Sequence, residues 1–168
     1  KQKLKLLYII QCLMEKTDEE HAVTTQEIID YLALQGITAE RKSIYTDIDL
    51  LIDFGMDIIK KPGRSGGYTL ASRQFELAEL KLLVDAVQSS KFITTKKSRE
   101  LIGKLETLCS KYEATQLHRQ VVVTNRNKAV NENIYYNVDI IYNAIAENVK
   151  IQFQYFEWNV SKEMISTL

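Results

Sequence analysis

The stretch that most constrains the fold is residues 60–70, KKPGRSGGYTL. It contains the only proline of the chain, three of its six glycines and three cationic side chains. Glycine permits positive φ and close backbone approach, so this composition is typical of a tight loop. Two β-prone segments, 57–60 and 68–70, flank the Pro-Gly-Arg-Ser-Gly-Gly tip. The stretch therefore predicts a β-hairpin with a basic tip.

A helix is predicted before this hairpin, within TTQEIIDYLALQG. The Thr24 side chain can accept from the backbone of Glu27, and the Glu27 carboxylate can bind back to the backbone of Thr24, which is a capping box. The helix is expected over 25–35. Gly36 follows it, and a residue without a Cβ atom readily takes the left-handed conformation that ends a helix.

Another helix is predicted over 39–54, in TAERKSIYTDIDLLIDFG, with Thr38 as N-cap and Gly55 as terminator. Apolar side chains at helical spacing also predict a helix within residues 3–16, KLKLLYIIQCLMEK. Two short helices joined by a short turn form a helix-turn-helix unit. With the hairpin after it, this order predicts a winged helix-turn-helix in a mainly α (α+β) protein.

The predicted helix 39–54 has a hydrogen-bonding side opposite its apolar side, as expected of a helix that enters a major groove. The basic hairpin would add cations for the phosphates, and the exposed amide end of helix 25–35 could accept another phosphate. Asp47 is interpreted as a structural partner for a cation of the hairpin or the first helix. The candidate DNA-binding residues are Thr24, Thr25, Arg41, Lys42, Ser43, Tyr45, Thr46, Lys60, Lys61, Arg64 and Ser65.

The charge balance does not by itself indicate a nucleic-acid partner. The formal net charge is zero, and up to Arg73 there are ten Lys and Arg against eleven Asp and Glu. Salt screens charges beyond about 8–10 Å, so the local clustering of cations matters more than the sum. Two other readings stay open: the hairpin tip is an ordinary solvated turn, or the winged helix is a protein–protein interaction module without DNA binding.

The sequence offers no signs of catalysis, a cofactor or a metal site. It lacks a phosphate-binding glycine loop, a nucleophile elbow and paired catalytic carboxylates. Cys12 and Cys109 have no ligand-spaced partners and are expected to be buried thiols, whereas His21 and His118 are expected to be exposed. No apolar run reaches the roughly 18 residues that span a bilayer, so the expectation is a cytoplasmic, non-enzymatic protein.

The pattern changes after Arg73. Residues 74–117 show apolar spacing for a helical hairpin, and a homodimer contact is expected there, because dimerisation doubles the phosphate contacts. Residues 118–133 are more polar and are interpreted as a linker, with a possible short strand at 121–123. A helix is predicted to begin at Ile134. The alternating segment 150–158 predicts a strand with one buried face, for which the sequence offers no obvious partner.

The segments ERKSIYTDIDLLIDFG, GGYTL, LAELKLLVDAV and IYYNVDIIYNAIAENVKIQFQYFEW, taken in this order, resemble bacterial transcriptional regulators that join a winged helix-turn-helix to a WYL domain. The resemblance implies a DNA-binding domain at 1–73, a helical linker or dimerisation region at 74–117, a linker at 118–133 and the start of a WYL domain at 134–168. It also implies a nucleotide or oligonucleotide effector.

Two features depart from that family. Its recognition helix commonly carries Arg where this chain has Thr46. The sequence also ends before any Trp-Tyr-Leu motif, and it does not begin with Met. The chain is therefore expected to be a fragment, a proteolysed species or the ordered part of a longer protein, with most of the effector site missing.

Overall fold

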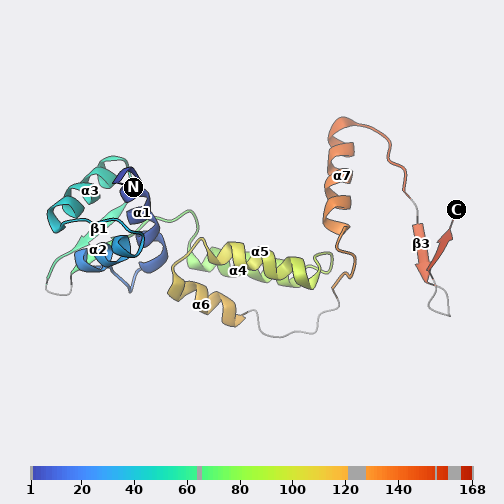
Figure 1. The fold of residues 1–168 in the computed structure, drawn as a ribbon. Coiled ribbons are helices and arrows are strands. Elements are labelled where there is room, and N and C mark those ends of the chain that lie inside the picture. The colour runs from blue at the N-terminus through green and yellow to red at the C-terminus, as the bar shows by residue number, and fades with distance from the viewer. Residues whose placement is uncertain (1, 64–65, 121–127, 154, 159–163, 168) are drawn as a thin grey trace.

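The computed structural model describes residues 2–63, 66–120, 128–153, 155–158 and 164–167. Within them the chain is mainly α, as predicted, and it contains two small antiparallel sheets (Figure 1). A short 3-10 helix, Gln2–Leu4, precedes the first α-helix. The helices are α1 Lys5–Lys16, α2 Thr25–Leu34, α3 Arg41–Asp53, α4 Leu77–Ser89, α5 Thr95–Glu106, α6 Lys111–Gln120 and α7 Ile134–Glu147. The strands are β1 Ile58–Lys61, β2 Gly67–Leu70, β3 Tyr155–Trp158 and β4 Met164–Thr167.

The first three helices and the β1–β2 hairpin share one hydrophobic core, which gives the N-terminal unit a winged-helix-like arrangement. Each of the three helices contributes side chains with no exposed surface, and burying such a side chain contributes about 1.5–3 kcal/mol. The thiol of Cys12 lies in the same core, as predicted, and burial raises its pKa to about 11. The fully buried residues of this core are Ile9, Cys12, Leu13, Ile28, Leu32, Ile44 and Ile48.

Local sequence signals set the turn between α2 and α3. The predicted capping box of Thr24 and Glu27 is present, with both reciprocal hydrogen bonds. Gly36 has φ of +71°, so the predicted left-handed turn is confirmed. The prediction of Thr38 as the next N-cap is wrong, because α3 begins after Glu40. The buried Ile37 anchors the turn in the core, and the chain continues without helical structure to Glu40 before it turns into α3.

The hairpin forms as predicted. Strand β1 is shifted by one residue toward the C-terminus from the predicted 57–60, and β2 begins one residue before the predicted 68–70. Ile59 lies opposite Thr69 in the antiparallel register. Val23 forms an isolated bridge with Tyr68, which binds the hairpin to the start of α2. A Cβ atom on Gly67 would lie 2.3 Å from the carbonyl oxygen of Val23, so this bridge requires glycine. The hairpin is called the wing below.

Helices α4, α5 and α6 form a second unit around their own small core. Its buried apolar residues are Leu80, Val84, Ile102, Cys109 and Leu117. Cys109 is buried as predicted, and burial raises the pKa of its thiol to about 11. The linker was predicted to begin at residue 118, but α6 continues to Gln120. The predicted strand at 121–123 lies outside the described residues.

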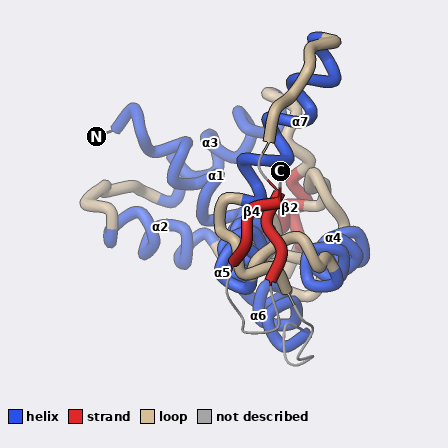
Figure 2. Tube along the Cα trace, turned by 90° about the vertical axis from the view of Figure 1, so that its right-hand side faces the viewer, coloured by secondary structure: helices blue, strands red, loops and turns tan. Residues whose placement is uncertain are grey.

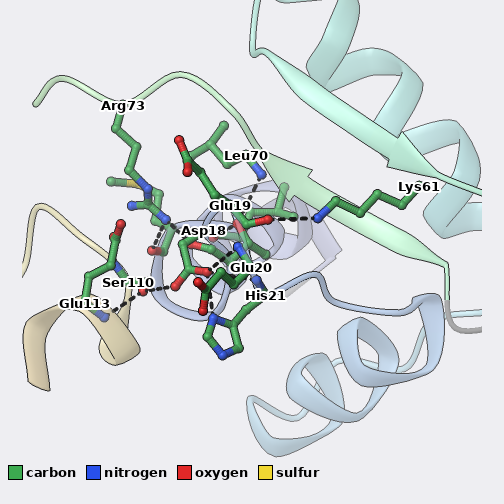
Figure 3. Close-up of polar contacts among 12 residues, drawn as sticks. Asp18, Glu19, Glu20, His21, Lys61, Leu70, Arg73, Ser110 and Glu113 are labelled. Atoms are coloured by element: carbon green, nitrogen blue, oxygen red, sulfur yellow. Dashed lines mark hydrogen bonds and ion pairs between the residues drawn. The ribbon is translucent and has the colours of Figure 1, made fainter. Parts of the chain in front are cut away.

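The two units meet at the loop between α1 and α2 (Figure 3). The Asp18 carboxylate is buried there and accepts from the Ser110 hydroxyl at 2.5 Å and from Nδ1 of His21 at 2.6 Å. Ser110 immediately precedes α6, and its hydroxyl also accepts from the backbone amide of Glu113. The prediction that His21 is exposed is wrong: its ring is half-buried and stacks on Tyr112, with 3.7 Å between the ring centroids. His118 is exposed, as predicted.

Cations and backbone groups from the wing side reach the same loop (Figure 3). Arg73 donates to the carbonyl oxygens of Met14 and Thr17, and Lys61 donates to that of Glu19. The hydroxyl of Thr17, which is fully buried, accepts from the Leu70 amide. The loop therefore holds α1, the wing and α6 together.

The C-terminal elements have little packing of their own. Helix α7 begins at Ile134, as predicted, and stands apart from the helical unit in Figure 1. Of its residues with described side chains, only Ala144 is buried. The strand predicted over 150–158 forms only at β3, and its expected buried face is absent at residues 151–153, where Ile151 and Phe153 are exposed. The expectation that it has no partner is wrong, because β4 pairs with it (Figures 1 and 2). Among the described residues, no helix is both long and apolar enough to cross a bilayer.

The Asp18 network yields a pH-dependent prediction. Burial alone would raise the pKa of Asp18, but hydrogen bonds from Ser110 and His21 outweigh it and lower the pKa from the ordinary value of 3.8. The charged carboxylate therefore contributes stability above about pH 3.8, and this contribution is lost as the pH falls further. We expect Asp18→Asn to lower the free energy of unfolding by about 1.5–3 kcal/mol at pH 7.

Urea denaturation at pH 7 and at pH 3 measures this effect. The difference between wild type and Asp18→Asn should shrink at pH 3, because the carboxyl of the unfolded chain, with the ordinary pKa of 3.8, is largely protonated at that pH, so the native charge stabilises the fold less than at pH 7. Asp53→Asn is the control, since Asp53 is exposed and should change stability little at either pH. An equal loss in Asp18→Asn at both pH values would show that the charge of Asp18 is not what stabilises the loop.

Candidate nucleic-acid interface

The outward side of α3 carries most of the predicted DNA-binding residues of this helix. Arg41, Lys42, Tyr45 and Thr46 are exposed, whereas Ile44 and Ile48 of the opposite side are fully buried. This division follows from helical periodicity, since residues three and four apart share a face. The structure thus brings three cationic or hydroxyl-bearing side chains and one tyrosine together on one exposed helix surface.

Ser43 is the exception among the predicted residues of α3. It is half-buried, and its hydroxyl accepts from the Lys5 ammonium at 2.5 Å. The same ammonium pairs with the Asp47 carboxylate at 2.6 Å. The structural role predicted for Asp47, as the partner of a cation of the first helix, is confirmed. Ser43 therefore faces α1 and supports α3 from behind, so it is not part of the exposed surface.

Neighbouring side chains already hold two of the exposed residues. A guanidinium nitrogen of Arg41 donates to Oε1 of Gln26 at 3.3 Å, which connects the beginning of α3 to α2. The Thr46 hydroxyl donates to the backbone carbonyl of Lys42 at 3.3 Å. Both contacts are long and exposed, so a base edge or a phosphate can replace either of them at low cost.

The beginning of α2 is less suited to a phosphate than the sequence indicated. The carboxylate of Glu27 accepts from the Thr24 amide at 2.7 Å and from the Thr24 hydroxyl at 2.9 Å. It thus places a negative charge at the helix end that was expected to receive an anion. Thr25, the first residue of α2, is half-buried beside it. A phosphate contact at Thr24 and Thr25 stays a prediction. The nearby carboxylate of Glu27 would repel the phosphate.

The wing presents its two described cations in different directions. Lys60 pairs with Asp49 of α3 at 2.5 Å, and this hydrogen bond raises the pKa of the Lys60 ammonium. Lys61 donates to the carbonyl oxygen of Glu19 at 3.1 Å. Both side chains are exposed. The other two predicted residues of the wing, Arg64 and Ser65, lie outside the described residues.

The pairs Lys60–Asp49 and Lys5–Ser43 were not anticipated from the sequence. Each joins residues that are distant in the sequence, and the pairing depends on how the wing and α1 pack against α3. A local signal did exist for Lys5, since it is a lysine within an apolar helical segment whose neighbours enter the core. For Asp49 there was none, because an exposed aspartate is usual on a solvated helix face.

The C-terminal end of α3 is apolar on its outer side. Leu50 is 51% exposed and Phe54, just after the helix, is 82% exposed. The outward surface of α3 is therefore divided, with a polar and cationic part from Arg41 to Asp49 and an apolar end. The exposed side chains of α3 that were predicted to bind DNA all lie in the first part.

Comparison with known protein families gives a match in the N-terminal unit. The family model described as the D3 domain of FokI matches residues 7–63, from α1 to just beyond β1 and about a third of the chain. No curated protein and no solved structure matches. The matched segment coincides with the helices and first strand of the winged-helix-like unit. Since this family model is a DNA-binding-related domain, the likeness hints at a DNA-binding-related role for this unit. The match does not extend to residues 134–168, where the resemblance to a WYL domain stays a prediction.

Proposed function

We propose that the N-terminal unit binds duplex DNA and that the protein regulates transcription. The observation that carries the proposal is the outward side of α3, where Arg41, Lys42 and Thr46 are exposed while Lys5 and Asp47 fix the helix from behind. A rigid helix with donors along one exposed side is the element that reads base edges in a major groove. The FokI D3 likeness of this segment supports a DNA-related role.

In this proposal α3 lies in the major groove and its first two turns meet the base edges. Lys42 and Thr46 are one turn apart on the same side, and Arg41 lies at the beginning of the helix. Arg and Lys favour the acceptors of guanine, and a threonine hydroxyl can serve as donor or acceptor. Tyr45, which is 47% exposed, would contact the sugar–phosphate backbone at the edge of the groove.

The wing supplies attraction that is blind to sequence. Arg64 would approach the phosphates beside the groove, and Lys60 would exchange its Asp49 carboxylate for a phosphate. This exchange costs little, since water screens an exposed ion pair, which then contributes little to stability. The Lys60–Asp49 pair thus holds the wing lysine near α3 without excluding it from DNA. Lys61 would have to leave the Glu19 carbonyl, on the other face of the wing, to reach a phosphate.

Other parts of the proposal rest on sequence alone. A homodimer formed through residues 74–117 would double the phosphate contacts and set the spacing of two half-sites. A WYL domain beginning near Ile134 would respond to a nucleotide or oligonucleotide. The role is one of binding, with no catalytic step assigned to any residue.

A protein–protein interaction module is the second candidate, and the apolar end of α3 favours it. Leu50 and Phe54 expose large apolar side chains next to each other on the helix surface, at i and i+4. A partner protein could cover them. The DNA and protein readings place their contacts at opposite ends of α3, so variants at the polar part distinguish them.

The first prediction concerns the wing. Replacing Lys60, Lys61 and Arg64 together by Gln should weaken binding to all duplexes alike and lower the slope of log K against log salt by up to about three. Binding would be measured by fluorescence anisotropy from 50 to 200 mM salt. The matched control is Lys96, Arg99 and Lys104 replaced by Gln, three exposed cations of α5 to which the proposal assigns no contact with DNA. An unchanged slope in the wing variant would remove the wing from the interface.

The second prediction concerns Asp49. Asp49→Asn removes a negative charge from the proposed surface and frees the Lys60 ammonium, so affinity for any duplex should rise by about 2- to 5-fold. The ratio of specific to scrambled affinity should not change. Asp53→Asn, on the same helix and away from the wing lysine, should raise affinity less. Equal effects of the two variants would show that the Lys60–Asp49 pair is irrelevant to binding.

The third prediction concerns sequence discrimination by α3. A duplex selected from a random pool should lose about 10- to 100-fold in affinity for the Lys42→Ala, Thr46→Ala double variant, since good base contacts contribute about 1–3 kcal/mol each. Affinity for scrambled duplex should fall much less. If the double variant binds both duplexes like wild type, while Leu50→Ser, Phe54→Ser abolishes capture of a partner protein, the protein-interaction reading replaces the DNA reading.

A further inference from the structure

A cleft of about 780 Å³ lies on the side of the wing that faces away from the core. Its walls come from the α1–α2 loop, the wing, the segment that enters α4, and α6. Successive side chains of a strand lie on opposite faces, so the wing contributes to both the core and the cleft. Ile58 packs in the core, whereas Ile59 and its cross-strand partner Thr69 line the cleft. The volume is within the 300–1,000 Å³ that is usual for small-molecule sites.

One wall of the cleft is apolar and solvent-accessible. Ile59 is 49% exposed and Phe75 is 36% exposed, and both line the cleft. Leu77 and Ala78, at the start of α4, continue this wall. An isoleucine and a phenylalanine from different units can enclose a flat or extended apolar body between them.

The charged groups of the cleft are mostly carboxylates, and the described cations already have backbone partners. Lys61 donates to the Glu19 carbonyl, and Arg73 donates to two carbonyls of α1 and the loop after it. Two of the carboxylates also have partners: that of Asp18 accepts from the Ser110 hydroxyl, and that of Glu113 accepts from the Ser110 amide. The ionisable groups that line the cleft are Asp18, Glu19, Glu20, Glu76 and Glu113 as acids, with Lys61, Arg73, His21 and Tyr112.

Glu19 and Glu20 are the two carboxylates that the cleft leaves open. Both are exposed, and neither side chain has a hydrogen bond or ion pair within the described part of the chain. Asp18 differs, since it is buried and accepts from Ser110 and His21. The unpaired charge available to a ligand is therefore negative.

A buried hydroxyl adds an independent sign of a missing partner. Thr69 is 4% exposed, and its hydroxyl oxygen has no hydrogen-bond partner among the residues that the structure describes. Leaving such a group unpaired costs about 1–3 kcal/mol. Thr69 lies opposite Ile59, next to the apolar wall, and rotation about its χ1 angle would turn the hydroxyl toward a ligand in the cleft.

The geometry points to a binding site for a small organic ammonium ion with an aromatic body. The ammonium group would lie at the Glu19 and Glu20 carboxylates, the apolar body would pack between Ile59 and Phe75, and the Thr69 hydroxyl would gain a polar partner. Such a ligand touches the wing and the helical unit at once. It would therefore fix the wing relative to α4 and α6. The site does not depend on DNA binding and can be tested on the protein alone.

The test is a titration of the whole chain, labelled with ¹⁵N, with 2-phenylethylamine, followed by calorimetry and by backbone NMR shifts. We expect a dissociation constant below about 1 mM, with the largest shifts at the amides of Ile59, Thr69 and Phe75. 3-Phenylpropionate has a similar body and the opposite charge, and it should not bind. Spermidine carries charge without an aromatic body, and it should bind more weakly than the arylamine.

Variants establish that the carboxylates of the cleft are responsible. The double variant with Glu19→Gln and Glu20→Gln should bind 2-phenylethylamine about tenfold more weakly. The control double variant, with Glu40→Gln and Asp53→Asn, removes the same charge at exposed positions outside the cleft and should keep the wild-type affinity. Phe75→Ser should lower the affinity for 2-phenylethylamine and leave the affinity for spermidine unchanged. Absence of arylamine binding, shifts located elsewhere, or equal losses in the two charge variants would each overturn the inference.

Discussion

The loop at Thr17 and Asp18 is the contact on which the arrangement of the two units depends. Two adjacent side chains, both buried, bind in different directions: the Thr17 hydroxyl accepts from the Leu70 amide, and the Asp18 carboxylate accepts from Ser110. Buried polar groups are costly unless they are paired, so each of these bonds favours one relative position of its partners. The same loop leads directly into α2, the helix that precedes α3. The loop therefore connects the unit of α4, α5 and α6 to the helices of the N-terminal unit.

The outer surface of α3 depends on a second polar contact, behind the helix. Lys5 lies between Ser43 and Asp47 and connects the beginning of α1 to the middle of α3. Because both groups are partly buried, losing one partner would leave the other charge poorly solvated. The contact fixes the rotation of α3 about its own axis, and this rotation decides which side chains are exposed. The polar outer side is therefore a result of both the apolar periodicity and this ion pair.

Features with local causes could be predicted from the sequence, and features with distant causes could not. The capping box of Thr24 and the turn at Gly36 depend on residues within a few positions, and both were predicted correctly. The wing and the outward side of α3 also followed from local patterns. The stacked position of His21 and the Ser43 contact with Lys5 were missed, because their partners come from other helices. Pairing of β3 is an exception, because it was missed although its partner β4 is the next element of the chain.

The two faces of the wing connect the proposed DNA surface with the cleft. Along β1, Ile58 and Lys60 face the core and α3, whereas Ile59 and Lys61 face the cleft and the α1–α2 loop. Successive side chains of a strand lie on opposite faces, so a sheet of only two strands carries both surfaces back to back. A two-stranded hairpin has little rigidity of its own and takes its position from what packs on it. A contact on one face of the wing can therefore shift the whole hairpin, and with it the side chains on the other face.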